Sequence, residues 1–203
     1  SGPTFALEIA QGMPSAIVAA SDSEKTALLI QSIFSCIHLK VFISNDPLGV
    51  EIGGALKNII AITTGIADGL KAGNNARAAI ITRGLVEMIR IGTALGAKTE
   101  TFSGLTGLGD MVLTCTGELS RNRQMGLRIG NGENAHEIIK DIKTSVEGFM
   151  TVKSAYELKN KLNIQATIIH ETYKILYESK SPHEALESLM NVRINSEFEG
   201  IKG

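Results

Sequence analysis

The pattern of apolar and polar residues divides the chain near residue 46. Before that point, residues 15–20 and 39–44 have the pattern of short strands, the second alternating apolar and polar positions. Between them, Ser21–Glu24 predicts a capping box and a following helix with an apolar face, made up of Ala27, Ile30, Phe34 and Ile37. Because a βαβ unit needs further strands to cover its edges, we expect residues 1–45 to be the tail of an α/β domain.

From Pro47 onward the apolar residues recur at helical spacing, and no alternating run occurs. A long helix is predicted over residues 49–68, with its apolar positions at Ile52, Leu56, Ile59, Ile60 and Ile66. After a turn, Asn74 or Asn75 can cap a second long helix that Gly96 ends. That helix is expected to bury Ile80, Ile81, Leu85, Met88 and Leu95.

Two glycines inside the second long helix, Gly84 and Gly92, each cost about 1 kcal/mol relative to alanine. Such a cost is tolerated where backbones approach closely, so we expect the two long helices to cross. The remaining pattern is helical as well, with predicted pieces over residues 104–116 and 120–129, from 133, over 151–162 and 165–179, and a last helix that opens with a capping box at Ser181-Pro182-His183-Glu184.

One lysine stands out in the first long helix. Lys57 lies in an otherwise uncharged stretch between Glu51 and Asp68, beside Gly53 and Gly54. An ammonium close to buried backbone is desolvated, which favours its neutral form and suits a general acid or base. Spacing alone leaves open a structural alternative, in which the lysine extends out of a helix interface to solvent.

A second polar cluster spans Gly107–Thr116 and continues through Ser120-Arg121-Asn122-Arg123. Asp110 and Thr114 are four residues apart and share a helix face. Ser120 stands at an expected helix N-cap, where free backbone amides and Arg121 could bind a phosphate. The alternative is an exposed cap with solvated arginines.

Composition and charge narrow the classes of function. The formal net charge is −1 and no run of five like charges occurs, so the basic surface expected for nucleic acid or an anionic membrane is absent. No stretch of 18 uninterrupted apolar residues spans a bilayer. Two cysteines make no disulfide framework in a chain of this size, which fits a cytoplasmic protein. A start at Ser1 without Met or a basic leader suggests a truncated or processed chain.

Several apparent motifs predict no site. Residues 130–135 match the glycine fingerprint of dinucleotide sites, but the preceding residues are helical in pattern, so an inter-helix turn is expected. Cys36 and His38 lack two further ligands, and we predict no metal site. Surface or capping roles are expected for His136, His170 and His183.

Six segments occur in a characteristic order: Ser1-Gly2-Pro3-Thr4-Phe5-Ala6, Gly53-Gly54-Ala55-Leu56-Lys57-Asn58, Asn75-Ala76-Arg77-Ala78, Thr101-Phe102-Ser103-Gly104-Leu105-Thr106-Gly107-Leu108-Gly109-Asp110, Ser120-Arg121-Asn122-Arg123 and Val146-Glu147-Gly148. Together they resemble the bacterial NAD(P)-dependent glycerol-3-phosphate dehydrogenases over nearly the whole chain. The resemblance implies a mainly α, multi-helical, 6-phosphogluconate-dehydrogenase-like C-terminal domain for substrate binding and catalysis over residues 46–203. It would be preceded by a βαβ remnant of a Rossmann-type dinucleotide-binding domain over residues 1–45.

The family interconverts dihydroxyacetone phosphate and sn-glycerol 3-phosphate, with NAD or NADP as cofactor, for phospholipid biosynthesis. By resemblance, Lys57 would be the general acid/base, and the substrate would be bound by Gly2, Thr4, Lys57, Asn58, Asp110, Thr114, Ser120, Arg121 and Asn122. The positions that would reach the cofactor are Ala6, Arg121 and Glu147. Most of the family's cofactor contacts belong to an N-terminal domain that this chain lacks, so we expect the chain alone to be inactive.

Two other functions are considered. Another β-hydroxyacid dehydrogenase of the 6-phosphogluconate-dehydrogenase-like group would typically carry Asn four residues after the lysine, where this chain has Ala61. Asn58 directly after Lys57 favours the glycerol phosphate family instead. The other alternative is a helical association module without catalysis, in which Gly84 and Gly92 pack between subunits of a homodimer. One departure is Ser145, where the family usually has an aliphatic residue, so no contact is assigned to it.

Overall fold

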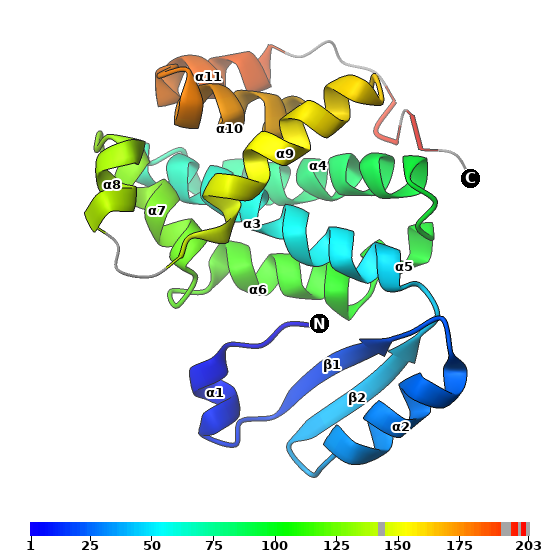
Figure 1. The fold of residues 1–203 in the computed structure, drawn as a ribbon. Helices are drawn as coiled ribbons and strands as arrows, with labels where there is room; N and C mark the ends of the chain where they lie inside the picture. The colour runs from blue at the N-terminus through cyan, green and yellow to red at the C-terminus, as the bar shows by residue number, and fades with distance from the viewer. Residues whose placement is uncertain (142–144, 192–195, 199, 202–203) are drawn as a thin grey trace.

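The computed structural model of this protein describes residues 1–141, 145–191, 196–198 and 200–201. A body of helices lies over a small unit of two strands and one helix, and the N-terminus lies between them, beside α6 (Figure 1). The predicted fold class, mainly helical after a short βαβ unit, is confirmed. Residues 202–203, which the predicted domain 46–203 includes, lie outside the described residues.

The small unit consists of β1 (Ser15–Ala20), α2 (Glu24–Phe34) and β2 (Leu39–Ser44), and both strands have the predicted bounds. The strands pair in parallel, as a strand-helix-strand order requires. A short helix that the sequence did not predict, α1 (Ala6–Ala10), precedes them. The position of the predicted capping box is wrong, because α2 is capped by Ser23, whose hydroxyl accepts the N–H of Thr26.

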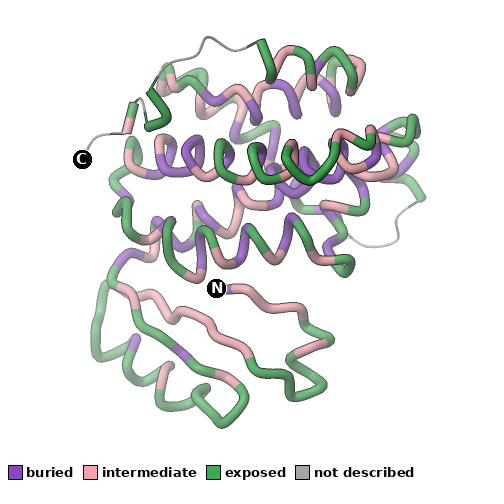
Figure 2. Tube along the Cα trace, turned by 180° about the vertical axis from the view of Figure 1, so that it is seen from behind, coloured by how far each residue is buried: buried purple, intermediate pink, exposed green. Residues whose placement is uncertain are grey.

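The predicted apolar face of α2 is buried at one position only. Ala27 is 3% exposed, whereas Ile30 and Phe34 are 36% and 53% exposed. Ile37 lies beyond the end of the helix and is 82% exposed. The βαβ unit is therefore mostly exposed or half-buried, with only short buried stretches at Ala27 and Val41 (Figure 2).

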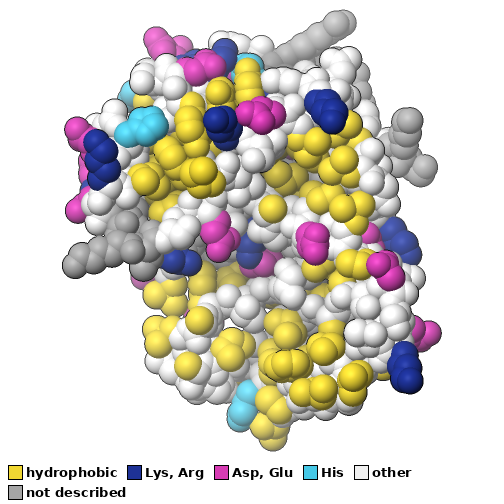
Figure 3. All heavy atoms as spheres, viewed as in Figure 1, with side chains coloured by type: hydrophobic (Ala, Val, Ile, Leu, Met, Phe, Trp, Pro, Cys, Tyr) yellow, Lys and Arg dark blue, Asp and Glu magenta, His cyan; other side chains and the backbone are white. Residues whose placement is uncertain are grey.

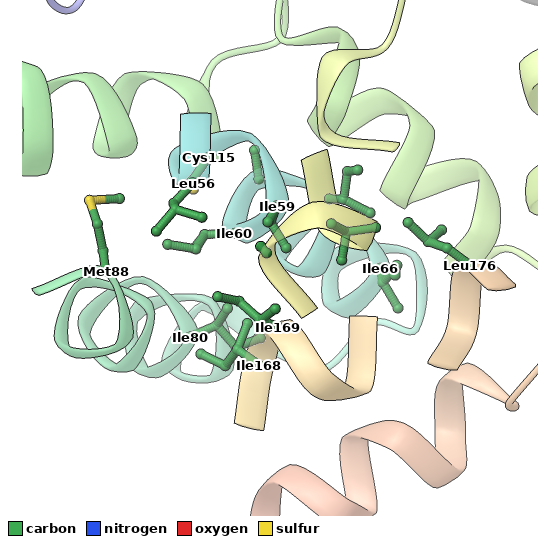
Figure 4. Close-up of a cluster of buried hydrophobic side chains, with 14 of the residues drawn as sticks. Leu56, Ile59, Ile60, Ile66, Ile80, Met88, Cys115, Ile168, Ile169 and Leu176 are labelled. Carbon is green, nitrogen blue, oxygen red and sulfur yellow. The ribbon is translucent and has the colours of Figure 1, made fainter. Parts of the chain in front are cut away.

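The central element is α3 (Pro47–Gly69), which begins with Pro47 behind an Asp46 cap. Its apolar side chains form the middle of the core, where Ile59 and Ile62 are fully buried. Figure 4 shows how α3 places Leu56, Ile59, Ile60 and Ile66 among side chains from the surrounding helices. Among the described residues, α3 is the one helix long and apolar enough to cross a membrane, with a mean hydropathy of 1.2, but 72% of that segment is buried inside the protein.

The second long helix, α4 (Gly73–Ala94), begins and packs differently from the prediction. Its N-cap is Ala72, so Asn74 and Asn75 lie inside the first turn, and neither side chain caps the helix. Leu95, expected in the core, is 37% exposed because it follows the last helical residue. The predicted stop is confirmed, since Gly96 adopts a positive φ of 99° just after the C-cap.

The glycines of α4 make room for side chains and not for a second backbone. A Cβ atom on Gly84 would lie 2.8 Å from the Ile60 side chain, and one on Gly92 would lie 2.1 Å from the Phe102 ring. The predicted close backbone contact occurs elsewhere, between α3 and α7 (Arg121–Gly130). Cβ atoms on Gly65 and Gly126 would lie 2.1 Å and 2.0 Å from carbonyl oxygens of the opposite helix.

The other helices follow the predicted order with shifted ends. The stretch 104–116 divides into a π-helical turn η1 (Leu105–Gly109) and α6 (Asp110–Thr116), ended by Gly117. A short helix that the sequence did not predict, α5 (Thr99–Ser103), precedes it. The later helices are α8 (Ala135–Asp141), α9 (Glu147–Lys161), α10 (Thr167–Tyr177) and α11 (Pro182–Met190). The capping box predicted at the start of α11 is not formed, because its N-cap Ser181 makes no side-chain capping bond. Within the stretch 130–135, residues 131–134 form the predicted inter-helix turn between α7 and α8.

Candidate active site

Lys57 and Asp110 form an ion pair between the middle of α3 and the start of α6. The side chain of Lys57 is 19% exposed and that of Asp110 is 4% exposed. Lys57 therefore does not extend to open solvent, as the structural alternative required. Burial raises the pKa of Asp110 above its usual value, while the hydrogen bonds from Lys57 and Thr114 act in the opposite direction.

Thr114 lies one helical turn after Asp110, as the four-residue spacing predicts. Its hydroxyl donates to the backbone carbonyl of Asp110 at 2.6 Å and lies 3.3 Å from the Asp110 carboxylate. Both side chains are buried. Thr114 therefore helps to hold the carboxylate that faces Lys57.

A chain of hydrogen bonds joins α3, α7 and the start of α9 beside this ion pair. Asn58, which follows Lys57, donates from Nδ2 to the Glu147 carboxylate at 3.1 Å. Asn122 donates from Nδ2 to Asn58 Oδ1 at 3.0 Å, and its own Oδ1 accepts the N–H of Gly148 at 2.9 Å. Three segments that are distant in sequence are thus joined at one point.

The first turn of α7 presents a positively polarised helix end. Ser120 is the N-cap, and its hydroxyl accepts the N–H of Arg123. The first amides of a helix lack partners within the helix and point out of its end. Arg121 is exposed and, within the described part of the chain, has no ion-pair partner. Since Arg123 pairs with the buried Asp68 at 2.7 Å, only one of the two arginines is available to an anion.

Three predicted site residues, Gly2, Thr4 and Ala6, belong to the N-terminal segment, whose first residue lies beside this cluster. Gly2 is buried against β1, since a Cβ atom on it would lie 2.9 Å from Ile17 Cα. Ser1 lies against α3 at Gly54, three residues before Lys57, with its Oγ 3.6 Å from a Cβ built on that glycine. Thr4 donates its hydroxyl to the carbonyl of Gly2 at 3.3 Å. Ala6 is the exposed first residue of α1.

Sequence reasoning missed the parts of the site that depend on long-range pairing. Asp68 accepts bonds from Arg77 and Arg123 and so ties the start of α7 to the end of α3. Asp46 accepts from Gly49, Lys98 and Thr101 and so ties the start of α3 to the segment before η1. An acidic residue at an end of the long apolar helix was a signal for each, but it did not reveal the partner.

A cleft of about 540 Å³ lies between the βαβ unit and the α5 to η1 segment. Its lining includes Ser21, Asn45, Lys98 and Glu100, and none of the predicted site residues. Among the described residues, no three His, Cys, Asp or Glu side chains are grouped in a way that could hold a metal ion. The polar cluster around Lys57 is thus defined by its hydrogen bonds and not by this cleft.

The fold is that of the helical domain of a dinucleotide-dependent dehydrogenase. The family model described as the C-terminus of NAD-dependent glycerol-3-phosphate dehydrogenase matches residues 46–187. The chain therefore belongs to the NAD-dependent glycerol-3-phosphate dehydrogenase family, as the sequence resemblance indicates.

Individual relatives support the same family assignment. The chain is 50% identical over 199 residues to a glycerol-3-phosphate dehydrogenase [NAD(P)+] of Syntrophotalea carbinolica, covering 98% of this chain and 60% of the relative. A protein of the same name from Citrifermentans bemidjiense is 49% identical, with 97% and 59% covered. The crystal structure of glycerol-3-phosphate dehydrogenase from Coxiella burnetii matches 94% of this chain and 59% of its own, with TM-score 0.91 and 41% identity. The chain thus spans about 60% of the length of its relatives.

Proposed function

We propose that this chain carries the substrate-binding and proton-transferring half of an NAD(P)-dependent glycerol-3-phosphate dehydrogenase. The enzyme would interconvert dihydroxyacetone phosphate and sn-glycerol 3-phosphate. The single observation that supports this most is the pairing of Lys57 with Asp110 next to the Asn58 and Asn122 chain. Lys57, the proposed proton donor, is followed in α3 by Asn58, which is hydrogen-bonded to Asn122 at the anion-binding start of α7.

In the proposed reduction, a nicotinamide cofactor held at this site would supply the hydride that adds to C2 of the ketone. The electron pair of the C2 carbonyl bond moves onto its oxygen, and the Lys57 ammonium gives that oxygen a proton. Asp110 holds the ammonium of Lys57 in place before the transfer. In the oxidation, neutral Lys57 takes the proton from the C2 hydroxyl. Asn58 and Thr114 orient this pair and the substrate hydroxyls.

The substrate phosphate would bind at the start of α7. Arg121 supplies the available guanidinium, and the free amides of the first turn supply donors along the helix axis. Among the described residues the Ser120 hydroxyl only accepts, from the N–H of Arg123, so its hydrogen would be available to the phosphate. Asn122 contributes its side-chain amide. Gly2 and Thr4 would approach the substrate from the β1 side.

The cofactor, NAD or NADP, would be held on this side by Ala6, Arg121 and Glu147. Glu147 fits ribose hydroxyls because it is exposed and its carboxylate accepts hydrogen bonds, and Arg121 fits a pyrophosphate. Residues 1–45 would be the end of the nucleotide-binding domain and residues 46–203 the substrate domain. We expect little or no turnover by the 203-residue chain alone. A cytoplasmic homodimer that serves phospholipid biosynthesis completes the proposal.

The test is a chimera in which this chain follows the N-terminal part of a curated relative. We expect it to oxidise NADPH or NADH with dihydroxyacetone phosphate and to act far less on dihydroxyacetone, which lacks the phosphate. Preference for a β-hydroxyacid without phosphate would support the alternative dehydrogenase. A folded chimera inactive on every substrate would favour the association module.

A further inference from the structure

We propose that the start of α9, through Glu147 and Gly148, fixes the direction in which Asn122 presents its amide to the substrate phosphate. This inference rests on the proposed function, because it takes the start of α7 to be the phosphate site. It assigns to Glu147 a positioning role that is separate from cofactor binding. It also explains why the next residue, Gly148, is a glycine.

The two ends of the hydrogen-bond chain allow one orientation of both amides. The backbone N–H of Gly148 can only donate, so the Asn122 atom 2.9 Å away must be its oxygen. The NH₂ group of Asn122 must then face Asn58, 3.0 Å away. At the other end, an ionised Glu147 can only accept, so Asn58 must donate with its nitrogen, 3.1 Å away. Both ends therefore demand the same direction.

This direction decides the sign of the interaction with an anion. An amide NH₂ group has two hydrogens, and Asn122 uses one of them on Asn58. The second has no acceptor among the described residues, and it lies on the second residue of α7, where the helix end also attracts an anion. The opposite rotamer would place a carbonyl oxygen there and repel the phosphate. Asn122 therefore offers a hydrogen-bond donor to the anion only while its hydrogen bonds to Asn58 and Gly148 are formed.

The local packing supports the role of α9. A Cβ atom on Gly148 would lie 2.7 Å from Asn122 Oδ1 and 2.8 Å from the carbonyl oxygen of Asn58. Only glycine therefore lets the α9 backbone reach the Asn122 oxygen. Asn122 and Asn58 are themselves buried, at 9% and 4% exposed, so water competes poorly for their bonds.

The test uses the 203-residue chain and inorganic phosphate, with binding and the side-chain amide signal of Asn122 followed by NMR. Glu147→Gln removes the charge but keeps an acceptor, whereas Glu147→Ala removes both. Comparing the two neutral variants separates orientation from charge repulsion. We expect Glu147→Ala to bind phosphate about 3–10-fold more weakly than Glu147→Gln, the cost of one neutral hydrogen bond. Glu157→Ala, an exposed change on the same helix, should match the wild type.

The possible results lead to different conclusions. Equal phosphate affinity of the Gln and Ala variants, with an unchanged Asn122 signal, would overturn the positioning role and leave the phosphate site standing. Absence of phosphate binding by the wild-type chain would overturn both. A shifted Asn122 signal in Glu147→Ala alone, together with weaker binding, supports the inference.

Discussion

The helical body buries its large apolar residues, whereas the βαβ unit leaves many of its own exposed. In the body, α3 is surrounded by other helices, and Ile59, Ile62 and Ile91 are fully buried. In the βαβ unit, Ile33, Phe34 and Phe42 are 61%, 53% and 55% exposed. Figure 3 shows apolar side chains gathered on the surface of that lower part of the molecule. The body thus has an interior of its own, and the βαβ unit has almost none.

This difference in burial explains why the side chains of the candidate site are held in defined positions by the helical body. Lys57, Asn58, Asp110 and Asn122 all lie on helices of the body, and their neighbours are held by close packing and buried hydrogen bonds. The segment around Gly2, which precedes the βαβ unit and packs against β1, lies at the edge of the cluster. Stability and site geometry should therefore depend on the same helices, and the following changes test that dependence.

The largest effect is expected where α3 and α7 touch. A Cβ atom on Gly126 would lie 2.0 Å from the carbonyl oxygen of Ile62, and backbone cannot move aside as a side chain can. Overpacking usually costs about 1–3 kcal/mol and occasionally more, and because this clash is with backbone we expect Gly126→Ala to exceed that range, at about 4 kcal/mol, or to prevent folding. Gly54→Ala is the control, because its nearest neighbour is 3.6 Å away. Urea unfolding of both variants measures the difference, and equal stability would contradict the close contact.

The comparison between the two regions can be tested directly with a matched pair of isoleucines. Ile59 is fully buried and Ile37 is 82% exposed. Ile59→Ala should lower the free energy of unfolding by about 3 kcal/mol because it leaves a cavity, whereas Ile37→Ala should change it by less than about 0.5 kcal/mol. Chemical denaturation reports both values. A large loss at Ile37 would show that the βαβ unit buries more than its exposure indicates.

A smaller effect involves the buried carboxyl of Glu87, which accepts the N–H groups of Ile168 and Ile169 at the start of α10. Burial raises its pKa to about 7 from an ordinary value of 4.5. Between these values the folded state holds a proton that the unfolded state has lost, so stability falls as pH rises. We expect a fall of about 2 kcal/mol between about pH 5.5 and 7.5 from this group.

The measurement for Glu87 is the free energy of unfolding across that pH range, compared with Glu87→Gln. The variant loses one acceptor and will be shifted overall, but its slope with pH should be flatter by the contribution of this group. Exposed Glu157→Gln should keep the wild-type slope. Identical slopes in wild type and Glu87→Gln would mean that Glu87 is already ionised throughout.

Much of the fold follows from the sequence because its signals are local. The bounds of β1 and β2, the length of α3 and the stop at Gly96 all follow from periodicity and turn chemistry within a few residues. The N-terminus of α4 was mispredicted because Asn74 and Asn75 are good caps by composition, whereas the N-cap is Ala72 and the helix starts at Gly73. Cap preferences do not fix which of several adjacent residues is used.

The candidate site was predictable as a set of residues but not as an arrangement. The resemblance names Lys57, Asn58, Asp110 and Asn122, and spacing places Thr114 on the Asp110 face. The hydrogen bonds that run from Glu147 through Asn58 and Asn122 to Gly148 join residues up to 89 positions apart. No local sequence pattern reveals such pairs. The two long helices do pack together, with Gly84 of α4 against the Ile60 side chain of α3. The close backbone contact expected there occurs instead at Gly65 and Gly126, between α3 and α7, because a glycine in a sequence does not determine which helix lies opposite it.

The central claim is that Lys57 transfers the proton. The most direct measurement is turnover of dihydroxyacetone phosphate with NADPH by the chimera carrying Lys57→Ala, beside Lys153→Ala, an exposed lysine on α9. We expect Lys57→Ala to lower kcat by about 10²–10⁴-fold, as loss of a general acid does, and Lys153→Ala to leave it unchanged. Wild-type turnover in the Lys57→Ala chimera would contradict the claim.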